Sequence, residues 1–578
     1  MPANIGQDGK MSNGKVTNDK VSDANRSELK LYYRANQIPS PPTAILFGFQ
    51  QLMVCVSGLL VTPYILSNTA CAGAATALIR VKLISTTLVV AGLSTLLQNT
   101  LGVRLALLQG PSFAYLPPIF AFSNLPEFKC NVSAHEEVPE EDYLLRLRIM
   151  QGSLVAASAL QIFIGMTGFI GLITKFIGPL TIAPLMLLLM LSVVGTIVDH
   201  AEQHILSLVQ VSVLLLVAVY LARVKVPLPV IKKRRISFKA LPIFTLFPYL
   251  LAIGVCWLIS YIITATGWER PGGAARTDKP DSTAVLREAP WLRIPYPGQW
   301  GAFGFNTGVF LGFFAAALAS LIESVGAYHA CARISDERPP PAHAVNRGVL
   351  IEGVGVLLAG LFGSGVGVTT YSENIGVINI TKVASRVTLQ IAGLIMIVLG
   401  IFTKFGAVLA TIPEPLVGGI LCVSMSMVGG VGLSSMQLVN LKMSRNVAVL
   451  GFSIMAGMVI PLYFERHPLK TGLTELDNVL NIVLTIRMFV GGLIGFFMDN
   501  TVPGATRAQR GLHEHNDATA DEANNAPDAY SFPSIVNKVL SKIPCTRFVP
   551  FLPNLHKPQR ITPSEPPPVY NFSNTAPV

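Results

Sequence analysis

Long blocks of apolar residues alternate with shorter polar stretches along most of this chain. Residues 152–173 and 177–198, for example, contain no charged residue, and each block is long enough to cross about 30 Å of hydrocarbon as a helix. A segment in lipid must satisfy its own backbone hydrogen bonds, which favours helices. The pattern predicts an all-α membrane protein with about fourteen spanning segments, at residues 44–66, 83–101, 110–122, 152–173, 177–198, 204–222, 240–264, 303–331, 348–363, 370–383, 385–403, 407–432, 446–463 and 478–498.

The basic residues between these segments predict the orientation of the chain, because loops rich in Lys and Arg stay in the cytoplasm. When the first polar stretch is placed inside, residues 232–235, all Lys or Arg, face the cytoplasm, whereas the acidic or mixed loops 123–150 and 266–302 face outside. An even number of spans returns the C-terminus to the cytoplasm. We therefore expect residues 1–43 to be a disordered cytoplasmic tail, and residues 500–578 to be a second tail with a proline-rich end.

This orientation makes two predictions about the external loops. Cys71 and Cys130 both fall in such loops, where the environment is oxidising, and they are candidates for a disulfide. Asn131-Val132-Ser133 matches a glycosylation sequon in the same loop as Cys130, so Asn131 is a candidate glycosylation site.

Composition agrees with a membrane protein and excludes several other classes. Hydrophobic residues make up 51% of the chain and charged residues 13%, which is about half the charged share of soluble domains. Basic loops explain the net charge of +11, so we expect no nucleic-acid partner. The sequence offers no metal-ligand cluster, nucleophile motif or phosphate-binding loop, so we expect neither an enzyme nor a cofactor. The expected location is the plasma membrane, with lipid around the spans.

Two of the predicted segments are interrupted. The third contains Pro111, Pro117 and Pro118, and proline breaks a helix. The tenth follows a glycine-rich, extended stretch at 363–371 and contains only a short helix. Such a pair at matching positions in two halves is typical of inverted-repeat transporters. We therefore predict a 7+7 inverted repeat in which short strands and half-helices of the two segments cross near the midplane and offer polar backbone groups to a solute. The alternative is a pair of kinked structural helices.

Two acids lie in or beside these apolar segments. Glu323 lies in an otherwise uncharged span, where a carboxylate costs about 2.5–3.5 kcal/mol and usually faces a functional cavity. The alternative is that Glu323 pairs with a buried cation, although its span has no Lys or Arg. Glu373 and Asn374 begin the short helix of segment ten, and Ser112 and Phe113 follow Pro111 in segment three. Acids, an amide and an aromatic ring suit a flat solute that forms hydrogen bonds.

These residues also resemble a known family. Residues 373–382, ENIGVINITK, match the signature of the nucleobase–ascorbate transporters: Gln, Glu or Pro, then Asn-x-Gly, four residues, Thr, and a basic residue or Gly. Residues 323–333 resemble the eighth span of that family, and 289–297 resemble the external loop of its animal members, which belong to solute carrier family 23. The likeness extends from about Gln50 to Asp499.

The resemblance implies an architecture and a mechanism. Fourteen spans would form a core domain and a gate domain, the protein would dimerise through the gate, and the core would move as an elevator. A solute bound between core and gate would be transported together with Na⁺ or H⁺, without a fixed metal. The implied parts are the tail 1–43, core 44–173, gate 174–265, external loop 266–302, core 303–404, gate 405–499 and tail 500–578.

The resemblance also assigns roles to individual residues. By motif position, the residues that bind solute would be Glu323, Glu373, Asn374, Ser112 and Phe113. Residues that would serve coupling or helix packing are Gln50, Gln51, Gly376 and Thr381.

Three positions depart from the family pattern. Gln51 stands where the first span usually has His, and Ala327 stands where the eighth span usually has Asp four residues after its Glu. Both departures remove a titratable group, so cation coupling would be altered or lost, and a relative without transport activity is one alternative. Glu373 stands where the vertebrate ascorbate members have Pro.

Charge decides between the two substrate classes. Nucleobases are neutral and present N–H donors, which suit two carboxylates. Ascorbate is an anion, and at about 5 Å from a second carboxylate, with an effective dielectric of about 20, it would lose roughly 3 kcal/mol. We therefore expect a nucleobase such as uracil, xanthine or hypoxanthine, with L-ascorbate as the alternative if Glu373 is neutralised. An anion exchanger or channel is less favoured, because residues 105–125 and 365–381 contain no Lys or Arg.

Overall fold

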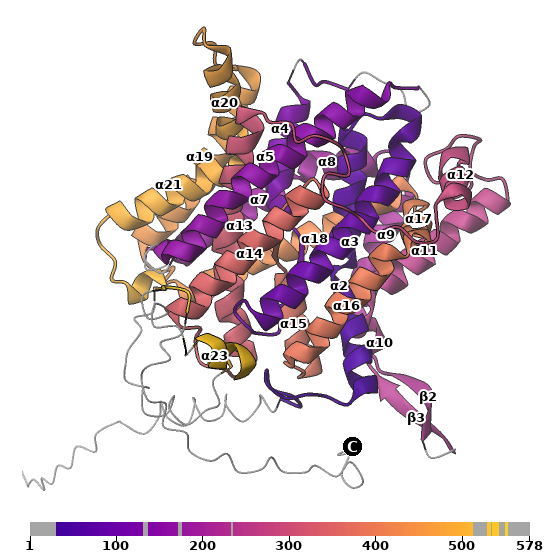
Figure 1. The fold of residues 1–578 in the computed structure, drawn as a ribbon, viewed down its shortest axis with the longest axis horizontal. Helices are drawn as coiled ribbons and strands as arrows, with labels where there is room; N and C mark the ends of the chain where they lie inside the picture. Colours follow the sequence, from indigo (N-terminus) through magenta and orange to yellow (C-terminus); the bar gives the residue numbers. More distant parts are fainter. Residues whose placement is uncertain are drawn as a thin grey trace, which may run out of the picture.

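The computed structural model describes residues 31–125, 127–130, 137–170, 176–232, 235–512, 529–532, 534–540, 542 and 549–552. These residues are mainly helical (Figure 1). Nine of the described helices are long and apolar enough to cross a membrane, or up to eleven if each of two bent helix pairs is one span. The predicted class of a helical protein with many membrane spans is thus confirmed, while the count of fourteen spans stays a prediction.

The first long helix that the structure describes, α2, begins with Pro41 and Pro42. Proline suits the first turn of a helix because the N–H groups there have no helical partner. The elements of the first half of the chain are α2 (Pro41–Thr69), η1 (Gly73–Ala75), α3 (Thr76–Thr100), β1 (Gln109–Pro111), η2 (Phe113–Tyr115), α4 (Leu116–Ser123), α5 (Glu140–Thr167), α7 (Pro179–Ser192), α8 (Val194–Ala201), α9 (Leu206–Leu215), η3 (Leu216–Tyr220), β2 (Val226–Lys232), β3 (Arg235–Leu241), α10 (Ile243–Leu246), α11 (Pro248–Ala265) and α12 (Pro280–Glu288). Helix α5 starts with three acids, which its dipole favours, and ends at Gly168 with φ of 74°.

The second half begins at Asn306, whose side chain accepts a hydrogen bond from the backbone N–H of Val309 at 3.1 Å and so caps α13. Its elements are α13 (Thr307–Ile334), α14 (Ala342–Phe362), β4 (Val368–Thr370), α15 (Ser372–Thr381), α16 (Arg386–Ile401), α17 (Thr403–Ala410), α18 (Glu414–Ser435), η4 (Met436–Leu438), α19 (Ser444–Arg466), α20 (Thr474–Thr485), α21 (Arg487–Thr501), η5 (Ala508–Arg510) and α23 (Ser534–Leu540). The bent pairs are α16 with α17, at 80°, and the end of α20 with α21, at 74°.

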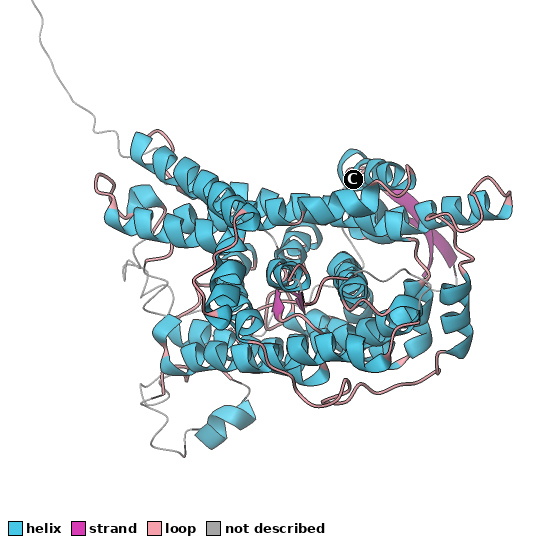
Figure 2. Cartoon of the chain, turned by 90° about the horizontal axis from the view of Figure 1, so that it is seen from above, coloured by secondary structure: helices cyan, strands magenta, loops and turns pink. Residues whose placement is uncertain are grey.

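The helices pack as two groups. In one group α5 packs on α14, α3 packs on α16, and α2 contacts both α3 and α16. In the other group α7 packs on α18, α19 and α21, and α9 packs on α18. Helix α13 packs on α5 in the first group and α20 packs on α19 in the second, and contacts between α13 and α20, and between α2 and α18, join the groups. Viewed from above, the short strands β1 and β4 lie near the centre, surrounded by helices (Figure 2).

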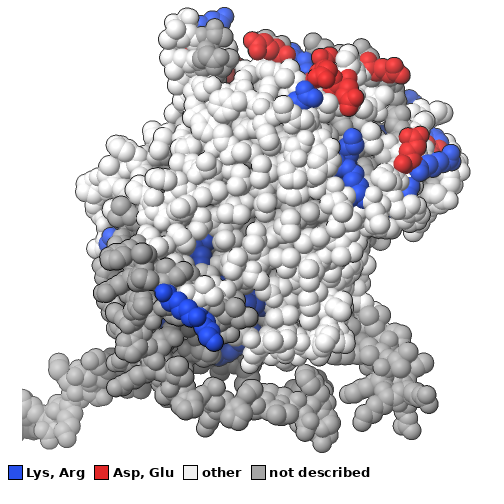
Figure 3. Space-filling view, in the orientation of Figure 1, with Lys and Arg blue, Asp and Glu red and all other residues white. Residues whose placement is uncertain are grey.

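Polar features gather at the two ends of the molecule. Helix α12 lies on the side opposite to the hairpin of β2 and β3 and to α23 (Figure 1). In Figure 3 the visible acidic side chains gather at the upper edge, and a broad uncharged band occupies the middle of the face. This distribution is what a membrane-spanning body requires.

Four segments predicted as loops or tails contain more structure than we expected. Residues 226–232 and 235–241 pair as the antiparallel strands β2 and β3, where only a basic loop was expected. The loop 266–302 contains α12. Part of each predicted disordered tail also packs on the body: Tyr33 bridges to Val383, and Tyr530 is fully buried. The described parts of both tails thus contact the body, one through the backbone at Tyr33 and the other through the buried ring of Tyr530.

In the structure a disulfide joins Cys71 and Cys130, whose Cα atoms are 5.7 Å apart. The candidate glycosylation site Asn131 lies outside the described residues.

Candidate functional site

The two interrupted segments meet in the middle of the chain's fold. Strands β1 and β4 pair antiparallel, with Gln109 opposite Thr370 and Pro111 opposite Val368. The pairing continues past β1, where the backbone N–H of Ser112 donates to Gly367 O at 2.8 Å. Both predicted extended stretches therefore form strands, and they satisfy each other's backbone groups.

A tyrosine fixes this crossing to its surroundings. The Tyr371 hydroxyl donates to Pro111 O at 2.8 Å. A Cβ atom on Gly58 would lie 1.9 Å from that hydroxyl oxygen, and one on Gly110 would lie 2.7 Å from Cζ of the same ring. Any side chain at these two positions would displace the ring, so the glycines allow α2 and β1 to approach it.

A short helix follows each strand. After β1, the Ser112 side chain accepts a hydrogen bond from Ala114 N at 3.3 Å and caps η2, which leads into α4. After β4, α15 starts at Ser372, with Glu373 in its first turn. The N-termini of both short helices thus begin at the crossing, and their dipoles favour negative or electron-rich groups there. Ser112 and Phe113 are buried at this point.

Helix α13 contributes Glu323 and is fixed to the crossing by the next residue. The Ser324 hydroxyl lies 3.1 Å from Thr369 Oγ1 and accepts from Thr370 N at 3.3 Å. Within the described part of the chain, neither Glu323 nor Glu373 forms an ion pair, and both are partly exposed. Helix α13 also contacts α15, the short helix that carries Glu373. Two acids without a cation therefore lie beside the crossing.

Asn374 connects the short helix α15 to α2. Its Nδ2 donates to both Gln51 O and Gln51 Oε1, at 2.7 Å each. Both residues are buried, as is the neighbouring Gln50. The structure thus brings Gln51 and Asn374 together although the two residues are 323 positions apart.

Two of the predicted residues lie in less distinctive surroundings. A Cβ on Gly376 would meet no described atom within 4 Å, and the role in coupling or helix packing stays a prediction. Thr381 lies at the end of α15, where its hydroxyl donates to Val377 O at 2.9 Å. Its observed contacts are those of a helix end.

Sequence analysis missed Glu352 in α14. This residue is 1% exposed, and its carboxylate accepts hydrogen bonds from Tyr328 Oη at 3.0 Å, Thr370 Oγ1 at 3.2 Å and Gln161 Nε2 at 3.2 Å. The Thr370 contact places Glu352 directly behind the strand crossing. The criterion that selected Glu323, an acid within an apolar block, applies equally to Glu352 and could have found it.

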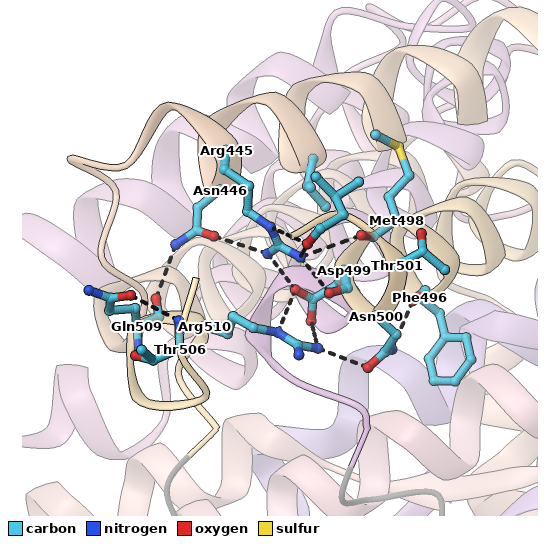
Figure 4. Close-up of polar contacts among 12 residues, drawn as sticks. Arg445, Asn446, Phe496, Met498, Asp499, Asn500, Thr501, Thr506, Gln509 and Arg510 are labelled. Carbon is cyan, nitrogen blue, oxygen red and sulfur yellow. Dashed lines mark hydrogen bonds and ion pairs between the residues drawn. The ribbon is translucent and has the colours of Figure 1, made fainter. Parts of the chain in front are cut away.

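A second buried acid lies far from the crossing in sequence and differs in its partners. The Asp499 side chain is fully buried, and it pairs with Arg445 at 2.8 Å and with Arg510 at 2.9 Å (Figure 4). This cluster joins α19, α21 and η5. An apolar cavity elsewhere is lined by residues such as Leu52, Leu60 and Phe405, and none of the predicted solute-binding residues lines it.

Comparison with known proteins gives consistent matches. Residues 42–466 match the model of the Permease family. The chain is 38% identical over 552 residues to human solute carrier family 23 member 2, covering 92% of this chain and 83% of that protein. It is 36% identical over 557 residues to mouse solute carrier family 23 member 1, covering 93% and 91%. Nucleobase-ascorbate transporter 5 of Arabidopsis thaliana is 32% identical over 488 residues, covering 82% and 89%. Among solved structures, the transmembrane domain of a cyanobacterium bicarbonate transporter BicA matches at 16% identity over 80% of this chain and 99% of that chain. Its TM-score of 0.40 is too low to support a conclusion about the fold.

Proposed function

We propose, from the premise that this chain belongs to the nucleobase–ascorbate transporter family, that it binds its solute at the crossing of β1 and β4 and carries it by cation-coupled secondary transport. The chain is an integral membrane transporter of this family and not an enzyme. The observation that carries the proposal is the pair of partly exposed acids, Glu323 and Glu373, beside two half-helices and without an ion-pair partner among the described residues. Acids left unpaired at this depth are stabilised by a bound solute or cation.

Relatives favour L-ascorbate as the solute more than the nucleobase that we expected from the sequence. Vertebrate members of solute carrier family 23 are 36–39% identical to this chain, and the plant nucleobase-ascorbate transporters are 30–34% identical. The sequence resemblance places ascorbate carriers among the vertebrate members. An ascorbate anion at this site requires that a cation, or a proton on one of the acids, neutralise the local negative charge.

A nucleobase remains the second candidate because of one specific observation. Glu373 occupies the position where the ascorbate members have Pro, and it lies in α15, which contacts α13, the helix of Glu323. Two carboxylates suit the N–H donors of a neutral ring better than an anion.

An elevator motion of a core against a gate would accomplish the transport. The proposed core consists of residues 44–173 and 303–404, and the proposed gate of 174–265 and 405–499. The two packing groups described above support this division, since α2, α3, α5, α14 and α16 contact one another on one side and α7, α9, α18, α19 and α21 on the other. We further propose fourteen spans in a 7+7 inverted repeat, a homodimer through the gate, the plasma membrane as location, and cytoplasmic termini.

Na⁺ or H⁺ would drive the transport. The coupling ion would bind together with the solute, beside the unpaired acids at the crossing. Glu352 is well placed to sense it, because its carboxylate is tied through Thr370 to β4.

Uptake by cells that express the chain tests the proposal. Labelled ascorbate, xanthine and uracil are compared in Na⁺ medium and in medium with Na⁺ replaced, at two pH values. Glu323→Gln should abolish uptake of whichever solute is carried, whereas the matched control Glu465→Gln, on an exposed ion pair with Arg487, should not. Ascorbate uptake without nucleobase uptake establishes the first candidate, and the reverse establishes the second. Normal uptake by Glu323→Gln contradicts the site.

A further inference from the structure

The side-chain amide of Asn374 is held in one orientation by Gln51. Its Nδ2 atom lies 2.7 Å from Gln51 O and 2.7 Å from Gln51 Oε1. A backbone carbonyl oxygen can only accept a hydrogen bond, so the Asn374 atom that faces it must be the nitrogen. This argument fixes the assignment of Asn374 nitrogen and oxygen, which is otherwise a choice between two similar shapes.

Both N–H groups of Asn374 are therefore used. The remaining atom, Oδ1, is buried, in a residue that is only 1% exposed, and it accepts no hydrogen bond from any described residue. A buried amide oxygen without a donor costs about 1–3 kcal/mol. The neighbouring residue Glu373 is partly exposed in the first turn of the same half-helix. An incoming donor at this half-helix would satisfy the oxygen.

We infer that Gln51 is a positioning residue that determines specificity: it consumes both donors of Asn374 and leaves only an acceptor for the solute. The inference rests on the proposed function, because it assumes that solute binds at the crossing. Ionised Glu323 and Glu373 are also acceptors only. The solute that fits presents a donor, an N–H or an O–H, toward Asn374, and a solute with a carbonyl oxygen or ring lone pair there is rejected because two acceptors face each other.

Gln51 suits this role better than an apolar residue of similar length. Its backbone oxygen alone would hold one Asn374 N–H, and the other would be free to turn toward the solute. The Oε1 atom removes that second donor. A Gln51→Met substitution keeps the length and the backbone bond but loses Oε1, so the amide of Asn374 could offer a donor as well as an acceptor.

Competition by methylated solutes tests this inference. Each N-methylxanthine, or each O-methyl ascorbate if ascorbate is the solute, blocks one donor. For the wild-type protein we expect that one methyl position weakens inhibition about tenfold, the effect of one lost hydrogen bond with a buried group left unpaired. In Gln51→Met the same ratio, taken relative to that variant's own inhibition by the parent solute, should fall below about threefold. Gln210→Met is the matched control, a buried glutamine in α9 with no described partner for its amide, and it should keep the wild-type ratio.

A double-mutant cycle separates this inference from the proposed function. Thermal unfolding of purified Gln51→Met, Asn374→Leu and the double variant measures the contact without any solute. We expect the double variant to lose no more thermal stability than the worse single variant. Additive losses would overturn the contact, whether or not the protein transports anything. Non-additive losses with an unchanged methyl ratio would overturn the specificity role. Absence of wild-type uptake of both solute classes would overturn the proposed function and the specificity role with it.

Discussion

Asp499 and Glu323 are both acids within apolar helices, but their surroundings are opposite. The fully buried Asp499 side chain lies between Arg445 and Arg510, with ion pairs of 2.8 and 2.9 Å (Figure 4). Glu323 is partly exposed and has no cation partner among the described residues. An acid that holds helices together needs its opposite charges beside it, because desolvation of a lone charge is costly. An acid that meets a solute must keep its oxygens free.

Glu352 lies between these two cases. It is as buried as Asp499, but the partners that surround it are the hydroxyls of Tyr328 and Thr370 and the amide of Gln161. Neutral donors of this kind stabilise a carboxylate without cancelling its charge. Glu352 is buried like a structural acid, but it has no opposite charge among these partners. Its hydrogen bond to β4 also connects it to the crossing, as expected of a functional acid.

Removal of the Asp499 carboxylate should have the largest effect on stability. Asp499→Leu leaves Arg445 and Arg510 without their shared acid, which should lower the free energy of unfolding by about 3–5 kcal/mol. Thermal unfolding of the purified protein in detergent, together with surface expression, measures this loss. The double variant Asp499→Leu with Arg445→Met removes one stranded cation and should recover part of the stability. A single variant as stable as the wild type would mean that the cluster does not hold α19, α21 and η5 together.

Glu323→Gln should show the reverse pattern. We expect uptake to fall at least about 100-fold, or about 2.7 kcal/mol, while the unfolding temperature stays equal to or above that of the wild type. No cation is stranded, and the cost of an unpaired carboxylate is relieved. Uptake normalised to surface expression, measured beside thermal unfolding, gives both values. A stability loss as large as that of Asp499→Leu would show that Glu323 has a structural partner, and the comparison would fail.

Glu352→Gln should have an intermediate effect on stability, about 1–2 kcal/mol. The new amide turns an N–H group toward hydroxyls that had donated to the carboxylate, and at least one donor is left unpaired. Glu352→Asp keeps the charge but shortens the side chain, so this matched variant separates the effect of side-chain length from the effect of charge. Thermal unfolding and uptake are measured for both variants. Loss of uptake in Glu352→Gln alone indicates that the charge matters, and loss in both indicates that geometry does.

Sequence patterns predicted the two interrupted segments that cross, but they did not predict which side chains meet at the crossing. Pro111 and the glycine-rich stretch before Thr369 indicated two extended, interrupted segments, because proline and glycine act on the local backbone. The Asn374–Gln51 bond joins residues 323 positions apart, and nothing local to either residue predicts it. Glu352 was within reach of the criterion applied to Glu323, but was overlooked. The sequence did not indicate that part of the C-terminal tail packs on the body, because the residues around it in the sequence are polar.

Truncation of the tail should have the smallest effect, and it tests how much residues 529–532 contribute to the surroundings of the buried Arg347. The buried Arg347 donates to Gly102 O and Tyr530 O, at 2.6 Å each, and its guanidinium lies 4.2 Å from the centre of the Phe532 ring. A chain that ends at Leu512 loses Tyr530 and Phe532 but lets water reach the arginine, so we expect a loss of only about 1 kcal/mol. A chain that ends at Leu552 keeps both residues and should match the full-length protein. Equal thermal unfolding of the two truncated chains would show that the segment at 529–532 contributes nothing, whereas a loss as large as that of Asp499→Leu would show that this segment contributes as much to stability as the Asp499 cluster does.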